Sequence, residues 1–374
     1  MDIHQPTPLL GGLSPAKFMR RHWQKKPLLV RGALPGVAPL LSRSQLFALA
    51  QRDGVESRLV MQDRARWQMK RGPFARRALP PVAQRKWTLL VQGVDLHDDR
   101  AHTLQQQFAF VPQARLDDLM ISWASDGGGV GPHFDSYDVF LLQVQGRRRW
   151  RIGRQADLTL RADAPLKILA NFEPEEEHVL EPGDMLYLPP RWAHDGIAQG
   201  ECQTYSIGFR APSRGELARE LLERMAEDAA DAAGEAIYRD AKQHATAQPG
   251  AVPHALREFA RDAMKRALGD KDAFDRALGE YLTEPKADVW FDAGEGGAAA
   301  GGIVLDRRTR MMYDARHVFI NGDGLRASGR DAKLMQALAD SRTLSAKQLR
   351  HASGDARDAI ASWLEAGWAH PLEE

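Results

Sequence analysis

The chain has 374 residues, which at about 150 residues per domain predicts two or three domains and a large buried core. Lysine plus arginine is 51 and aspartate plus glutamate is 50, so the net charge is +1. This balance excludes a surface coated in basic charge for nucleic acid, and we do not expect direct nucleic-acid binding. Hydrophobic residues at 43% with charged residues at 27% exclude wholesale disorder.

The chain has a single cysteine, Cys202, which excludes an intrachain disulfide and metal sites built on cysteine pairs. Its neighbours, Glu201 and Gln203, do not activate a nucleophile, so we interpret Cys202 as structural. The first residues lack a basic-then-apolar signal pattern, and no run approaches eighteen uninterrupted apolar residues. We therefore expect a cytoplasmic protein that does not contact a membrane.

Up to about Pro212 the sequence mixes short β-rich runs with turn signals. The runs lie at 139–144, 185–188 and 204–207, and the intervening turns include 126–129 and 181–184. Many short strands at this spacing predict a barrel or a sandwich rather than alternating βα units.

The pattern becomes helical after Pro212. Ser213 followed by Glu216 predicts a capping box, and the helix that it opens carries apolar residues at 217, 221 and 225. Two further amphipathic runs, at 256–267 and 274–282, follow a break at 248–250. Their wide apolar faces need a partner surface. The residues leave open whether that surface is the barrel or a second copy of the chain.

The last ninety or so residues change again. A Gly/Ala-rich loop at 294–302 introduces predicted short strands at 303–305, 311–313 and 318–320, with turns at 306–308 and 321–324. Helical spacing returns at 334–338, at 349 and at 360–364. This order resembles a winged-helix module, a fold that serves protein contacts as well as nucleic-acid contacts.

A candidate metal site lies in the run GPHFDSYDVF at 131–140. In a strand, residues two apart face the same side, so His133 and Asp135 present an imidazole and a carboxylate to one place. These are two of the three ligands of a 2-His-1-carboxylate iron site. His194, after an apolar strand, is the preferred third ligand. His178 is a rival, but its acidic flank at 175–177 predicts an exposed loop.

The basic run at 147–149 contains a candidate anion site. If alternate residues of this strand face inward and outward, Arg148 points into the barrel. Its planar, permanently charged guanidinium suits a carboxylate such as the distal end of 2-oxoglutarate. The glycines at 127–129 do not predict a phosphate loop, because no Gly-Lys-Ser/Thr follows and the next element reads as a strand. We interpret them as a turn that lets the backbone approach the metal strand closely.

Taken together, these motifs resemble the bacterial ribosomal oxygenases of the Jumonji C class. The shared runs are HWQKKP at 22–27, GGGVGPHFDSYDVF at 127–140, GRRRW at 146–150, and EPGDMLYLPP at 181–190 with His194. The resemblance covers essentially the whole chain. It implies an α+β fold with a double-stranded β-helix catalytic domain at 1–212, a helical dimerisation region at 213–284 and a winged-helix-like domain at 285–374.

The resemblance also implies a set of site residues. These are Fe(II) ligands His133, Asp135 and His194, the 2-oxoglutarate anchor Arg148, and a substrate-arginine pocket made by Asp118, Tyr137 and Ser206. One departure concerns Ala124, which stands where family members often place a hydroxyl that holds the cosubstrate. We expect Ser122 or Thr204 to take that part, with Ser125 as a further alternative.

The implied activity is hydroxylation of an arginine, at C3, in the sixteenth large-subunit ribosomal protein, with dioxygen as the second cosubstrate and a homodimer as the working form. A first alternative is a Jumonji-type hydroxylase of a histidine or another ribosomal side chain. A second is a cupin-like scaffold without catalytic activity that docks on ribosomes or nucleic acid.

Overall fold

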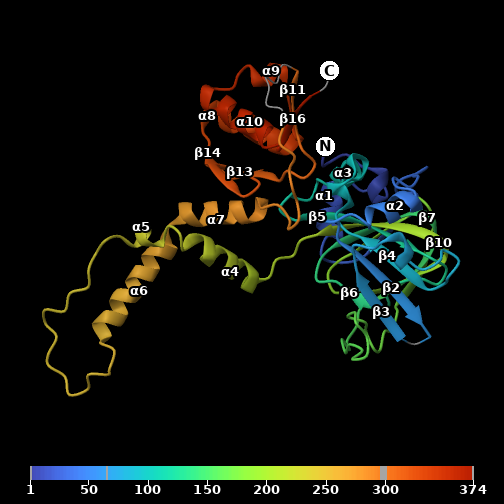
Figure 1. Cartoon of the computed structure of the whole chain (residues 1–374), viewed down its shortest axis with the longest axis horizontal. Coiled ribbons are helices and arrows are strands. Elements are labelled where there is room, and N and C mark those ends of the chain that lie inside the picture. The colour runs from blue at the N-terminus through green and yellow to red at the C-terminus, as the bar shows by residue number, and fades with distance from the viewer. Residues whose placement is uncertain (1, 65, 295–300, 373–374) are drawn as a thin grey trace. The chain divides into compact units, whose positions relative to one another are not determined.

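The computed structural model describes residues 2–64, 66–294 and 301–372. The chain divides into two compact units, residues 1–211 and residues 212–374 (Figure 1). The first unit ends where the predicted strands give way to predicted helices. The further boundary expected near residue 284 remains a prediction.

The first unit is built mainly of strands. In chain order its elements are η1 (Pro8–Leu10), α1 (Pro15–Arg21), β1 (Leu28–Val30), α2 (Arg43–Leu49), β2 (Ser57–Asp63), β3 (Arg66–Arg71), η2 (Arg76–Ala78), β4 (Trp87–Val91), η3 (Val94–Leu96), α3 (Asp99–Gln106), β5 (Leu116–Ala124), β6 (His133–Phe134), β7 (Val139–Gly153), β8 (Glu176–Leu180), β9 (Met185–Leu188) and β10 (Ala193–Phe209). The three strands predicted before Pro212 lie within β7, β9 and β10, and are confirmed.

Its strands form one antiparallel network in the order β1-β9-β7-β10-β5-β4-β2-β3, with β6 paired to β10 and β8 paired to β7. The long strands β7 and β10 pair with each other at both of their ends, and their register shifts between Gln199 and Gln203. Gly146 lies at this bend with a φ of 63°, and a Cβ there would lie 2.1 Å from the carbonyl oxygen of Glu201. The predicted α+β fold with a double-stranded β-helix core is confirmed.

Alternate residues of β7 pack into two different cores. Phe140 and Leu142 belong to the large cluster that includes Phe18 of the N-terminal helix α1. Leu141 faces the other way, into a smaller cluster that continues into the second half of the strand. Successive strand residues point to opposite faces. One face of β7 therefore packs against the N-terminal helix α1, and the other face points into the barrel.

The segment just after α1 is tied to the barrel by a buried carboxylate. Asp138, fully buried, accepts hydrogen bonds from the hydroxyl of Tyr187 at 2.6 Å and from the side-chain amide of Gln24 at 3.1 Å. Arg115 lies 3.3 Å from the same carboxylate. These contacts fix the backbone at Asp138, the residue that follows Tyr137.

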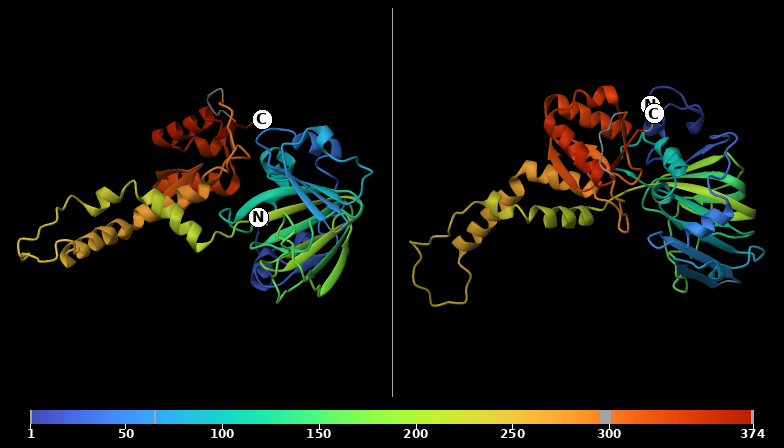
Figure 2. Two further views of the ribbon diagram at one scale, coloured as in Figure 1. Left: turned by 60° about the horizontal axis from the view of Figure 1, so that its bottom comes forward. Right: turned by 45° about the horizontal axis from the view of Figure 1, so that its top comes forward.

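The second unit begins with helices α4 (Arg214–Met225), α5 (Ala229–Ala233), α6 (His254–Gly269) and α7 (Lys271–Thr283). The predicted capping box is confirmed, because Ser213 accepts from the amide of Glu216 and the Glu216 side chain accepts from the amide of Ser213. Figure 2 shows the long segment that joins α5 to α6. Nothing among the described helices is both long enough and apolar enough to span a bilayer.

The rest of the second unit has the predicted winged-helix pattern. It contains β11 (Gly302–Leu305), β12 (Met311–Tyr313), β13 (His317–Ile320), β14 (Asp323–Arg326), α8 (Gly329–Ser341), β15 (Thr343–Ser345), α9 (Ala346–Leu349), α10 (Gly354–Glu365) and β16 (Ala369–Pro371). The predicted turn at 321–324 was too long, because β14 pairs with β13 from Asp323 onward. The predicted Gly/Ala-rich loop falls largely on residues 295–300, outside the described residues.

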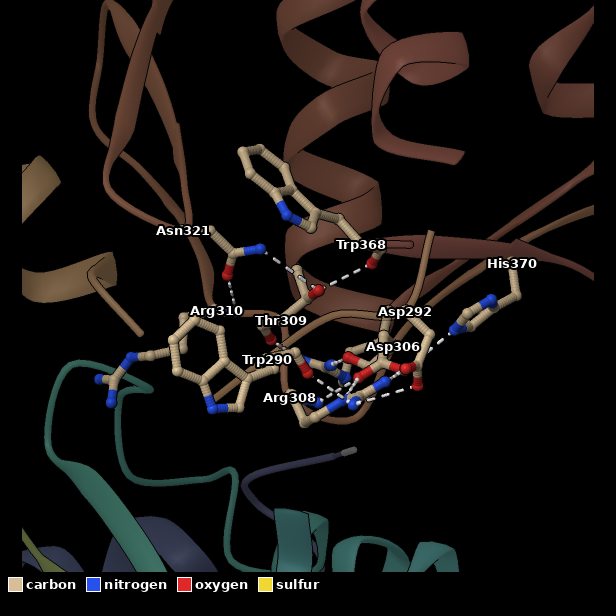
Figure 3. A network of polar contacts seen from close by, with 10 residues as sticks. Trp290, Asp292, Asp306, Arg308, Thr309, Arg310, Asn321, Trp368 and His370 are labelled. Carbon is tan, nitrogen blue, oxygen red and sulfur yellow. Dashed lines mark hydrogen bonds and ion pairs between the residues drawn. The ribbon is translucent and has the colours of Figure 1, made fainter. Parts of the chain in front are cut away.

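A polar cluster surrounds the buried carboxylate of Asp306 at the turn after β11 (Figure 3). The carboxylate of Asp306 accepts from the backbone and side chain of Arg308 and lies 2.9 Å from Nε2 of His370. Arg308 also donates to the carbonyl of Trp290. The cluster therefore joins the segment before β11, the turn after it and the last strand of this unit.

Candidate metal and cosubstrate site

Three side chains expected to bind a metal lie together where β6 and β10 begin. His133 and His194 face each other in the β6–β10 pair, and Asp135 follows β6 directly. One ligand atom from each of the three lies within 4.8 Å of the other two. Nε2 of His194 is 3.6 Å from the carboxylate of Asp135. Within the described ranges, this is the one group of at least three His, Cys, Asp or Glu residues with such geometry.

Backbone carbonyls fix the orientation of both imidazoles. Nδ1 of His133 lies 2.8 Å from the carbonyl oxygen of Gly131, and Nδ1 of His194 lies 3.0 Å from that of Trp192. Since a carbonyl only accepts, each Nδ1 carries the proton and each Nε2 presents a lone pair. Burial and then the nearby His133 lower the pKa of His194 to about 4. Its imidazole is therefore neutral at pH 7, which is the form that binds a metal ion.

Arg148 points into the barrel from β7. It is 5% exposed, whereas Arg147 is exposed and Arg149 is partly exposed, so the predicted alternation is confirmed. Nη1 of Arg148 donates to the hydroxyl of Ser122 at 3.2 Å. Nε and Nη2 are buried and have no hydrogen-bond partner among the residues that the structure describes. A buried guanidinium in this condition is costly, and a carboxylate that accepts two hydrogen bonds would satisfy it.

The structure separates the candidates for the second cosubstrate anchor. Ser122 lies opposite Thr204 in the β5–β10 pair and contacts Arg148 directly. The hydroxyl of Thr204 donates to the side chain of Gln143 at 2.8 Å, and that of Ser125 is held by the backbone of Trp87. Ser122 is therefore the hydroxyl best placed beside Arg148, and Thr204 stays a prediction with a weaker geometric basis.

The predicted substrate residues lie on the same side of the barrel. Asp118 and Ser206 share the inward face of β5 and β10 with Ser122, and both are buried. One oxygen of Asp118 accepts the amide of Gly93 at 2.9 Å. Tyr137 is 39% exposed. Burial of its phenol and the nearby carboxylates of Asp135 and Asp118 raise the pKa of Tyr137. Tyr137 is thus close to Asp118 and to the metal-ligand candidate Asp135.

The rival ligand and the glycine-rich turn take other positions. His178 lies on β8, where its Nε2 is 2.9 Å from the carboxylate of Glu176, and it does not belong to the group of three. Gly127 and Gly128 exchange backbone hydrogen bonds with Ala198 of β10. A Cβ at Gly129 would lie 2.5 Å from the carbonyl oxygen of Gly196, so the expected close backbone approach is confirmed.

Trp150 was not predicted as a site residue from the sequence. It lies on the inward face of β7 between Arg148 and Ile152, and its ring centroid is 5.8 Å from that of His194. The guanidinium carbon of Arg148 lies 5.6 Å from the same indole centroid. The available signal was the alternation of residues 148, 150 and 152, but a tryptophan in a strand ordinarily indicates core packing.

Comparisons with known proteins agree with this architecture. A family model described as a JmjC domain matches residues 103–217, and one described as a ROXA-like winged helix matches residues 265–370. The chain is 32% identical over 358 residues to the ribosomal protein uL16 3-hydroxylase of Escherichia coli, covering 90% of this chain and 92% of that protein. It is 36% identical over 209 residues to a probable ribosomal oxygenase of Haemophilus influenzae, covering 55% and 52%.

A solved structure shares the whole architecture. The Escherichia coli ribosomal oxygenase YcfD, in complex with cobalt and 2-oxoglutarate, superposes with a TM-score of 0.81 at 30% identity, covering 98% of both chains. The strand arrangement and the matching domains define a JmjC-type protein with an appended winged helix. More narrowly, this chain belongs to the ribosomal oxygenase family.

Proposed function

We propose that this chain is an Fe(II)- and 2-oxoglutarate-dependent dioxygenase that hydroxylates an arginine of ribosomal protein uL16, the sixteenth large-subunit protein, at C3. The observation that carries the proposal is the convergence of His133, Asp135 and His194, with both Nε2 atoms available as ligands. The name of the Escherichia coli relative, a uL16 3-hydroxylase, supports the substrate and the position.

The donors present fit a ferrous ion and an anionic cosubstrate. His133, Asp135 and His194 would hold the metal, in the ligand set typical of non-haem iron oxygenases. Bound iron with 2-oxoglutarate and dioxygen supplies oxidative decarboxylation and oxygen transfer to carbon. Arg148 would bind the distal carboxylate, because it has two buried nitrogen atoms without partners among the described residues, and Ser122 would support it.

The substrate arginine would enter beside Asp118 and Tyr137. A guanidinium that leaves water needs a carboxylate, which Asp118 supplies, and an aromatic face, which Tyr137 supplies. Ser206, on the same inward face, would complete the pocket. With the guanidinium held, the side-chain carbons of the arginine are oriented toward the metal ligands and water is excluded from the reacting carbon.

The test is an assay of succinate release with a uL16 peptide, paired with mass spectrometry of the peptide. We expect His133→Ala to abolish turnover and His178→Ala, which alters a histidine outside the ligand group, to leave it unchanged. Equal turnover by wild type and His133→Ala would contradict the proposal. An oxygen atom added to histidine would favour the histidine-hydroxylase alternative, and metal binding without turnover would favour the scaffold.

We also propose that the protein is a homodimer, that its partner is the ribosomal protein in the cytoplasm, and that it does not bind nucleic acid directly. Support for the dimer comes from α6, where Leu256, Met264 and Leu268 are exposed on one helix of the described chain. Light scattering at micromolar concentration tests it, and a monomer alone would contradict it. We also propose the division of the second unit into a dimerisation region at 213–284 and a winged-helix-like domain at 285–374, which the family resemblance implies.

A further inference from the structure

Three buried nitrogen atoms without hydrogen-bond partners belong to two side chains that are in contact inside the barrel. They are Nε and Nη2 of Arg148 and Nε1 of Trp150, and none has a partner in the part of the chain that the structure describes. The two side chains are in contact, with the guanidinium carbon 5.6 Å from the indole centroid. Buried N–H groups without acceptors cost free energy. A cluster of such donors therefore indicates a ligand that is rich in acceptors.

Trp150 occupies the stretch of β7 between the two ends of the candidate site. Arg148 precedes it by two residues, and Ile152, two residues further, pairs with His194. The residue opposite Trp150 is Gly196, where a Cβ would lie 2.6 Å from Cζ3 and 2.7 Å from Cη2 of the indole. The ring thus lies against the bare backbone of β10. The indole centroid lies 5.8 Å from that of His194 and 5.6 Å from the guanidinium carbon of Arg148, so the ring is near both a candidate metal ligand and the candidate anion site.

The surroundings of the indole are otherwise apolar. Trp150 is 5% exposed and packs with Leu141, Ile152, Leu180 and Leu186. Hydrocarbon side chains cannot accept its Nε1–H, and a tryptophan N–H that is buried usually has an acceptor. Packing explains the burial of the ring but leaves its Nε1–H without an acceptor among the described residues, as it leaves two nitrogen atoms of the adjoining Arg148.

We propose that Trp150 is a cosubstrate-binding residue, whose ring forms the wall between the metal ligands and Arg148 and whose Nε1–H donates a hydrogen bond to 2-oxoglutarate. The inference rests on the proposed function and deepens it. A molecule bound to the metal at its keto-acid end and to Arg148 at its distal carboxylate passes along the indole. It carries only acceptor oxygens, which match the three donors. Gly196 is then required because a side chain there would displace the ring.

The most direct test observes the indole N–H itself. In wild-type protein labelled with ¹⁵N-tryptophan and loaded with Zn(II), the indole signals of Trp150 and Trp87 are assigned from the Trp150→Phe and Trp87→Phe variants. We expect 2-oxoglutarate to shift the Trp150 indole proton downfield and to slow its exchange with water, while the Trp87 signal stays in place. An unmoved Trp150 signal in protein saturated with 2-oxoglutarate overturns the proposal.

Affinity gives a second, independent readout. Calorimetric titration of the Zn(II)-loaded protein should show that Trp150→Phe, which keeps a ring and removes the donor, weakens 2-oxoglutarate binding by about tenfold or more. Trp87→Phe is the matched control, because Trp87 is fully buried in the large core and its Nε1 likewise has no partner among the described residues. Unchanged affinity in Trp150→Phe would contradict this inference without affecting the proposed function. Failure of the wild-type protein to bind 2-oxoglutarate would contradict the proposed function instead. Should Trp150→Phe not fold, the Trp150 indole signal is assigned by elimination from phenylalanine variants of the other eight tryptophans, and its response to 2-oxoglutarate decides.

Discussion

Each unit has a buried charged side chain, Asp306 in one and Arg148 in the other, and the two differ in how completely their polar atoms are paired. The carboxylate of Asp306 is contacted by Arg308 and His370 (Figure 3). The backbone carbonyls of Asp306 and Thr309 accept hydrogen bonds from the guanidinium of Arg342. In the barrel, Arg148 donates to Ser122 but keeps two nitrogen atoms without partners among the described residues.

The contrast separates stability from function. A buried charge with its hydrogen bonds complete contributes to the fold, and removing its partner is strongly destabilising. A buried charge that lacks partners reduces the stability of the unliganded protein, and it persists where a ligand completes it. The two side chains should therefore respond to substitution in opposite ways.

The largest expected effect is that of Arg148→Met on cosubstrate binding. Loss of a charge-assisted, two-bond contact of about 3 kcal/mol should weaken 2-oxoglutarate binding by about 100-fold or more. The free energy of unfolding without ligand should stay the same or rise, because an incompletely paired charge is removed. Calorimetry and urea unfolding measure the two quantities. Arg147→Met, at the exposed neighbour, is the control, and unchanged affinity in Arg148→Met would remove the contrast.

Asp306→Asn should show the opposite pattern. Burial alone would raise the pKa of Asp306, but hydrogen bonds from Arg308 and His370 outweigh burial and lower it to about 2. Against an ordinary value of 3.8, this shift corresponds to about 2 kcal/mol of stability at pH 7. We expect the variant to lose about that much free energy of unfolding and to bind 2-oxoglutarate normally. Asp163→Asn, at an exposed ion pair that solvent screens, is the control and should lose much less free energy of unfolding than Asp306→Asn.

The same carboxylate predicts how stability depends on pH. Because the folded pKa of Asp306 lies below the unfolded value, its contribution is present above about pH 4 and is lost as the pH falls toward 2. The difference in unfolding free energy between wild type and Asp306→Asn should shrink across that window. A difference that stays constant from pH 7 to pH 2 would show that this ionisation does not stabilise the unit.

The smallest effect sharpens the contrast within the barrel. Ser122→Ala removes a neutral hydroxyl that contacts Arg148, so 2-oxoglutarate binding should weaken by about two- to tenfold. Ser125→Ala should leave binding unchanged, since its hydroxyl is held by the backbone of Trp87. A larger loss of affinity in Ser125→Ala than in Ser122→Ala would show that Ser122 is not the second cosubstrate anchor.

Local periodicity predicts part of this molecule well. The two-residue spacing of His133 and Asp135, and the alternation that turns Arg148 inward, follow from strand geometry alone. The capping box at Ser213 is equally local, because its two hydrogen bonds join residues three apart. Such features need no knowledge of which strands pair.

Contacts that depend on strand pairing cannot be predicted from local periodicity. The position of Trp150 beside His194 depends on the register of β7 against β10, which no local pattern gives. His370 reaches Asp306 across the sheet formed by β11 and β16, so the Asp306 cluster carries no motif. The anchoring of Thr204 by Gln143 depends on cross-strand pairing in the same way.

The most direct test of the central claim is an anaerobic titration of Fe(II) and 2-oxoglutarate, followed by the metal-to-ligand charge-transfer absorption of their complex. We expect saturation at one metal ion per chain, with the absorption lost in His133→Ala and retained in His178→Ala. Full absorption in His133→Ala would show that the iron is held elsewhere and that His133 is not one of its ligands.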